Sequence, residues 1–157
     1  MRKFAKLIAA AVAMTFIIAT PVMAAEPNPT LEGLLAYQAM HKAKVEAQVN
    51  DLIVKAWGNP EGPQWSHHIA VVREQVEKLN HEEDVSYVNY LQDVVNNRKD
   101  VERLKKELVA NCTELCKVNP GMAAQLATYQ ADYQNAVADR MNMEALLATA
   151  KTILNVQ

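Results

Sequence analysis

The chain has 157 residues, 50% of them hydrophobic, and a formal net charge of −2 at pH 7. This balance gives no electrostatic reason to expect nucleic acid as a partner, because proteins that bind nucleic acid carry basic patches. Two cysteines are too few for a disulfide scaffold, so the fold must depend on an apolar core.

Residues 1–24 have the pattern of a secretory signal peptide. Three basic residues precede an uncharged run, residues 7–19, and Val22 and Ala24 suit the −3 and −1 positions of a cleavage site. A membrane anchor is the alternative, but a spanning helix needs about 20 apolar residues and this run is shorter. We therefore expect a mature chain of residues 25–157 that is secreted or periplasmic, with no transmembrane segment after cleavage.

The mature chain predicts an all-α fold in one domain. Residues 30–57, 66–118 and 120–155 are rich in Ala, Leu, Gln, Glu and Lys, whereas Pro and Gly gather at the start and between these segments. No segment shows the sustained alternation of a strand. We expect three long helices that form coiled-coil hairpins in an elongated antiparallel bundle.

The loop between the first two helices is flanked by Trp57 and Trp65, in the segment WGNPEGPQWS. Two indoles beside a loop often pack on each other and close the end of a hairpin, and this is the interpretation that we favour. The alternative is an exposed platform for a ligand.

The long middle segment, 66–118, contains a possible break. Asn80 and Glu83 resemble a capping box, a pattern that starts helices, and the apolar spacing changes at the same place as in a stutter. A break near residues 80–84 would let two hairpins fold together as a four-helix bundle. Neither Gly nor Pro forces the break, so we favour the continuous, elongated form.

Two lines of residues at alternating steps of three and four predict that the last two helices lie along each other as an antiparallel hairpin. We call such a line a seam. In the last helix only Arg140 of the seam is charged, and in the middle helix Asn97 and Asn111 are polar seam positions that can fix register. The seam of the last helix comprises Met122, Leu126, Tyr129, Tyr133, Ala136, Arg140, Met143, Leu147, Ala150 and Leu154. The seam of the middle helix comprises Tyr87, Tyr90, Val94, Asn97, Val101, Leu104, Leu108, Asn111, Leu115 and Val118.

One group of residues has a spacing that could suit metal ligands, but the spacing is not specific to metal sites. Glu77, His81 and Asp84 stand at i, i+4 and i+7, which places two carboxylates and an imidazole on one helix face. A solvated polar face is the usual explanation of such spacing, so we predict neither a metal nor a cofactor. No catalytic motif is recognisable, and we assign no catalytic residue.

Both cysteines lie near the end of the middle helix. Cys112 and Cys116 share a face, and export makes their oxidation to an intrachain disulfide the favoured outcome. Free or intermolecular thiols, or a redox or metal role, are the alternatives. A position near a helix C-terminus opposes thiolate formation, which disfavours redox chemistry.

These observations predict an exported, non-enzymatic protein that acts as a protein-interaction or structural module through coiled-coil surfaces and self-associates. The motivation is the pair of seams, together with long helices that overlap incompletely and leave apolar surface uncovered. The alternative hypothesis is an extracytoplasmic helical bundle that binds a metal or a small ligand.

The disulfide gives a direct prediction. Thiol labelling of the native exported protein should detect no free cysteine, and labelling after reduction should detect two, because Cys112 and Cys116 lie side by side in an oxidising compartment. Two readily labelled thiols before reduction would contradict it.

Overall fold

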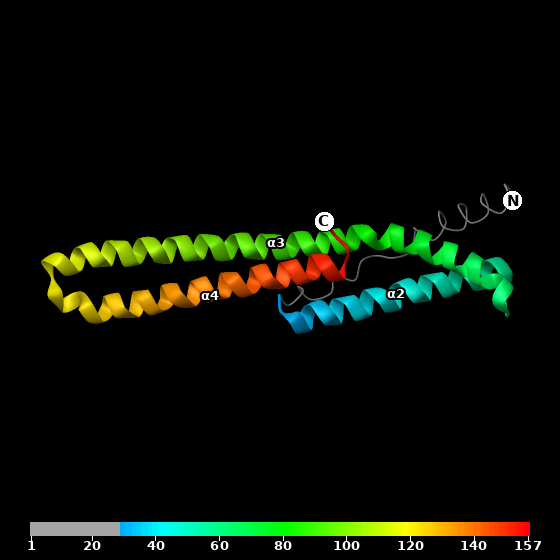
Figure 1. The fold of residues 1–157 in the computed structure, drawn as a ribbon, viewed down its shortest axis with the longest axis horizontal. Coiled ribbons are helices and arrows are strands. Elements are labelled where there is room, and N and C mark those ends of the chain that lie inside the picture. Colours follow the sequence, from blue (N-terminus) through cyan, green and yellow to red (C-terminus); the bar gives the residue numbers. More distant parts are fainter. Residues whose placement is uncertain (1–28) are drawn as a thin grey trace. The chain divides into compact units, whose positions relative to one another are not determined.

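The computed structural model describes residues 29–157, and the predicted signal peptide lies outside this range. The described residues contain three α-helices and no strand, so the all-α prediction is confirmed (Figure 1). A short 3-10 turn precedes each of the last two helices. The elements are α2 (Leu31–Trp57), η2 (Pro63–Trp65), α3 (Ser66–Val118), η3 (Pro120–Met122) and α4 (Ala123–Ile153).

The chain divides into two compact units, which we describe separately. Glu32–Glu83 form the described part of the first unit, with α2 and the beginning of α3. Pro29–Leu31 and Asp84–Gln157 form the second, with the remainder of α3 and all of α4. Residues 80–84 are helical within α3, so the predicted alternative of a break at this place is not found.

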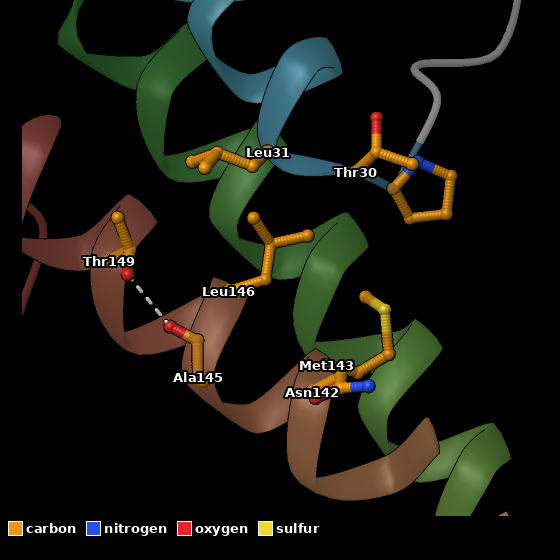
Figure 2. Close-up of a pocket in the computed structure, with 8 residues that line it drawn as sticks. Thr30, Leu31, Asn142, Met143, Ala145, Leu146 and Thr149 are labelled. Atoms are coloured by element: carbon orange, nitrogen blue, oxygen red, sulfur yellow. Dashed lines mark hydrogen bonds between the residues drawn. The ribbon is translucent and has the colours of Figure 1, made fainter. Parts of the chain in front are cut away.

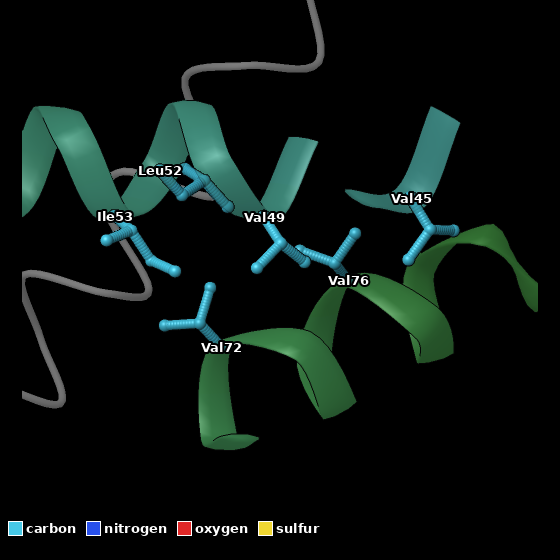
Figure 3. Packing of buried hydrophobic residues seen from close by; sticks show 6 residues of the cluster. All are labelled: Val45, Val49, Leu52, Ile53, Val72 and Val76. Carbon is cyan, nitrogen blue, oxygen red and sulfur yellow. The ribbon is translucent and has the colours of Figure 1, made fainter. Parts of the chain in front are cut away.

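The core of the first unit is a line of aliphatic side chains between two helices (Figure 3). Val49 of α2 and Val76 of α3 are the most deeply buried, and Trp57 and Ile69 pack against the edge of the cluster. These residues recur at helical spacing, so each helix presents one apolar face to the other. The buried cluster consists of Val45, Val49, Leu52, Ile53, Val72 and Val76.

Asn80 explains why α3 continues without a break. Its side chain is 6% exposed, and its amide nitrogen donates to the Gln48 side-chain oxygen and to the Val76 carbonyl oxygen, each at 2.8 Å. The amide therefore bonds to α2 and to the preceding turn of its own helix instead of capping a new helix. A buried polar group with its hydrogen bonds satisfied costs little and fixes the register of its neighbours.

The loop that ends α2 confirms the predicted packing of the two indoles. The ring centroids of Trp57 and Trp65 are 5.6 Å apart, and the His68 ring lies 5.9 and 5.8 Å from them. Gly58 follows α2 with a φ of 74°, a conformation that favours glycine, and its amide donates to the Val54 carbonyl at 2.9 Å. The helix thus ends in a left-handed turn beneath the ring cluster.

In the second unit, α4 runs antiparallel to α3 (Figure 1). The Asn119 side chain accepts a hydrogen bond from the Gly121 amide at 3.2 Å, so the turn begins at Asn119-Pro120 as the sequence predicts. The α4 seam is the inner face of its helix, as expected: its most buried members are Ala136, Met143, Leu147, Ala150 and Leu154.

The predicted α3 seam is wrong over its second half. Leu104, Leu108 and Leu115 are 55%, 42% and 51% exposed, and Val118 is 81% exposed. The least exposed line of α3, whose members are buried or half-buried, uses the residue that follows each predicted one, so the inner face is rotated by about 100°. This line comprises Val88, Leu91, Val95, Arg98, Glu102, Lys105, Val109, Cys112 and Cys116.

Arg140 gives a physical reason for the rotation. It is the one charged residue of the α4 seam, and on the observed face of α3 it meets the Glu102 carboxylate. On the predicted face it would meet Val101 and Leu104, which offer no anion. Arg140 also pairs with Glu144 of its own helix, and the observed face of α3 adds Glu102 as a second anion for the same guanidinium.

The first-unit core predicts the cost of one truncation. Val49→Ala should lower the free energy of unfolding by about 2 kcal/mol, because it removes two buried methyl groups and leaves a cavity. Val54→Ala is the matched control in the same helix, since Val54 is 59% exposed and should change the value by less than about 0.5 kcal/mol. Urea denaturation followed by circular dichroism measures both, and equal effects would contradict the assigned core.

Candidate functional site

The ion pairs between α3 and α4 set the geometry of the candidate site. Arg140 donates through Nε to Glu102 of α3 and through Nη1 to Glu144 of its own helix. Arg98 of α3 lies 3.0 Å from the Asp139 carboxylate, and Lys99 lies 3.2 Å from that of Glu144. These pairs hold the two helices in one register.

The charges of this network change each other's titration. Hydrogen bonding from Lys99 is the largest cause that lowers the pKa of Glu144, and the Arg140 charge lowers it further. The hydrogen bond to Glu102 is the largest cause that raises the pKa of Arg140. Both groups therefore remain ionised at neutral pH, and the ion pairs between α3 and α4 persist there.

The rotation of α3 leaves an apolar line on its outer surface. We call Val101, Leu104, Leu108, Leu115 and Val118 the α3 stripe. The last four are 42% to 81% exposed, and Val101 is half-buried. Single exposed apolar residues are ordinary, but four at steps of three, four and seven on one helix form a continuous surface.

Charged residues border the stripe on both sides. Four exposed carboxylates at steps of seven follow its outer edge: Asp93, Asp100, Glu107 and Glu114. Arg98 and Lys105, both half-buried, lie between the stripe and α4 along the other edge. An apolar line with an acidic border on one side and a basic border on the other has the composition of a helix-pairing surface.

A second candidate is an open hollow of about 330 Å³ in the second unit (Figure 2). Leu31, Met143 and Leu146 give it an apolar lining, and Thr149 at its edge already donates to the Ala145 carbonyl at 2.9 Å. None of its lining residues has a titratable side chain. The hollow could accommodate a small apolar group, but it presents no acid, base or nucleophile with an ionisable proton.

The structure does not assemble the predicted metal candidates into a site. Within residues 29–157, no group of three His, Cys, Asp or Glu side chains stands close enough to hold a metal ion. Glu77, His81 and Asp84 are therefore helical neighbours in sequence that do not converge on one point.

The two cysteines lie on the inner face of α3, with Cys112 buried and Cys116 half-buried. Burial is the main cause that raises the pKa of the Cys112 thiol, and the neighbouring Cys116 raises it further. A raised pKa keeps Cys112 protonated, which is the opposite of an activated nucleophile. The intrachain disulfide stays a prediction.

Comparison with known proteins adds no assignment: no family model, curated protein or solved structure matches the chain. Across residues 29–157, none of the helices combines the length and the apolar character needed to span a membrane.

Sequence reasoning placed the stripe residues inside the hairpin and so missed their exposure. The signal that could have revealed it is Arg140, the one charged residue of the α4 seam, beside which an acidic residue of α3 is favourable. Glu102 is the acidic residue at the corresponding level of α3, and choosing it as a seam residue turns the leucines outward.

The Arg140–Glu102 ion pair predicts that the effects of substituting its two residues on stability are not additive. Arg140→Leu should lower the free energy of unfolding, because it leaves the 22%-exposed side chain of Glu102 without its partner. The double variant Glu102→Leu/Arg140→Leu should recover most of this loss, since both charges are removed together. Urea denaturation measures all three proteins.

Arg103→Leu is the matched control for this prediction. Arg103 pairs within α3 with Asp100 and Glu107, and such exposed pairs contribute about 0–1 kcal/mol. Equal destabilisation by Arg103→Leu and Arg140→Leu would show that the Arg140–Glu102 pair contributes no more to stability than an exposed pair within one helix.

Proposed function

We propose that this protein is an exported, non-enzymatic helical module that self-associates through a coiled-coil surface on α3. The observation that carries the proposal is the exposure of Leu104, Leu108, Leu115 and Val118 on one line of that helix. The spacing of these residues is that of a coiled-coil seam, in which side chains of one helix insert between those of another.

Burial of the stripe supplies the free energy for association. Each buried methylene contributes about 0.8 kcal/mol, and a second helix would remove four large side chains of each copy from water. The charged borders would remain at the rim, where exposed charges contribute to orientation more than to affinity. This division of apolar centre and polar rim is typical of protein interfaces.

The chemistry of the described residues gives no support to a catalytic role. The hollow lacks ionisable lining groups, and burial disfavours the thiolate of Cys112. Arg98, Lys99 and Arg140 form ion pairs with Asp139, Glu144 and Glu102 that join α3 to α4. Such pairs suit a structural role.

Export is supported by the first 24 residues, with their basic start, uncharged run and small residues before a polar segment. We propose a secreted or periplasmic location on this basis. The alternative function, a bundle that binds a metal or small ligand, needed a break near residues 80–84 to create its pocket. Since α3 is helical there, the open hollow is the remaining feature that favours it.

The test is the oligomeric state of the expected mature chain, residues 25–157, by sedimentation equilibrium. We expect dimers or larger assemblies whose fraction rises with concentration. Leu104→Glu/Leu108→Glu should raise the dissociation constant at least about a hundredfold, because it places charges in the apolar centre.

The matched control is Val54→Glu, which adds a charge at an equally exposed apolar position of α2. It should leave association unchanged, and circular dichroism should show native helix content for both variants. A wild-type chain that stays monomeric at high concentration would overturn the proposal. Equal loss of association in the control would place the interface elsewhere.

A further inference from the structure

We propose that the partner of the α3 stripe is the same stripe of a second copy, aligned parallel and in register. This inference rests on the proposed self-association and adds its geometry. In coiled-coil notation, Val94, Val101, Leu108 and Leu115 occupy a positions, and Asn97, Leu104, Asn111 and Val118 occupy d positions. The remaining positions then decide how two copies of this helix fit together.

The charged borders select the parallel orientation. All four g positions from residue 93 onward are acidic: Asp93, Asp100, Glu107 and Glu114. Of the e positions, Arg98 and Lys105 are basic, whereas Cys112 is uncharged and buried. A parallel pair places each g residue beside the e residue five positions later in the other copy, so Asp93 meets Arg98 and Asp100 meets Lys105.

An antiparallel pair would have the opposite electrostatics. It places g beside g and e beside e, which brings two acidic rows together along one edge and basic residues together along the other. Like charges at these positions destabilise a coiled coil and act against the wrong partner orientation. The charge pattern therefore discriminates between the two arrangements, whereas the apolar stripe alone does not.

Asn97 and Asn111 agree with the same arrangement. Both are exposed polar residues on the line of the stripe. In a parallel, in-register pair each asparagine lies opposite its own copy, and two amides can donate to and accept from each other. In an antiparallel pair the core layers join a to d positions, so each amide would face a valine or leucine.

The inner face of α3 leaves the basic border available for such contacts. Arg98 Nε lies 3.0 Å from the Asp139 carboxylate of α4, an ion pair without a hydrogen bond from Nε, and the Arg98 side chain is 41% exposed. The guanidinium has five donors in a planar fork, so it can bind Asp139 of its own chain and Asp93 of a second copy together. The ion pair with α4 thus restricts the position of Arg98, the residue that contacts Asp93 of the second copy in the proposed interface.

The experiment is a charge swap at one of the predicted contacts, measured by sedimentation equilibrium at low salt. Asp100→Lys and Lys105→Glu should each raise the dissociation constant about tenfold, because each replaces two symmetry-related attractions by repulsions. The double variant Asp100→Lys/Lys105→Glu should return to within about threefold of the wild-type value, since the swapped charges attract again. Glu61→Lys, in the loop after α2, is the control for net charge and should have no effect.

The outcomes separate this inference from the proposed function. If wild-type chains associate and Leu104→Glu/Leu108→Glu disrupts them, but the swapped double variant is no better than the single ones, the stripe pairs in another orientation and the parallel arrangement is wrong. Single variants that associate like the wild type would also overturn it. A wild-type chain that never associates would overturn the proposed function itself.

Discussion

The ion pair between Arg140 and Glu102 joins the faces of α3 and α4 that meet in the second unit. The guanidinium lies in an otherwise apolar seam between two anions, Glu144 of its own helix and Glu102 of the facing helix. Because the pair lies partway along the hairpin, the rest of α3 must turn with it. Val88, Leu91 and Val95 then form the apolar inner face toward the start of this segment, and Cys112 continues it toward the turn.

The exposed stripe is a consequence of this choice. Once Glu102 faces α4, the more apolar line of α3 lies about 100° away and points to solvent. In the second unit, Arg140 of the α4 seam thus has an ion-pair partner on α3, whereas the leucines of the α3 stripe are exposed to solvent. Uncovered apolar surface of this regularity favours association, and this is why we interpret the stripe as an interface.

Helix type and bounds could be predicted from the sequence because they depend on local signals. Pro63, Pro120 and Gly58 mark the ends of helices, and the α4 seam follows from a regular apolar spacing that only Arg140 interrupts. The face of α3 could not be predicted in the same way, since the pattern of apolar residues favoured the wrong line. Asn80 shows the same limit: its capping-box spacing is local, whereas its bond to Gln48 depends on a helix 32 residues away.

Polar residues interrupt the apolar lines of the helices in two kinds of place: some contact the neighbouring helix of the same unit, and others are exposed to solvent. Asn80 and Arg140 find partners on the neighbouring helix of the same unit, so their presence there is explained within one chain. Asn97 and Asn111 lie on a line of leucines and valines yet face solvent. Exposed amides are ordinary on a solvated surface, and on the proposed interface they would specify register when two such lines meet. Their place on the stripe therefore agrees with the proposed pairing of two copies of α3.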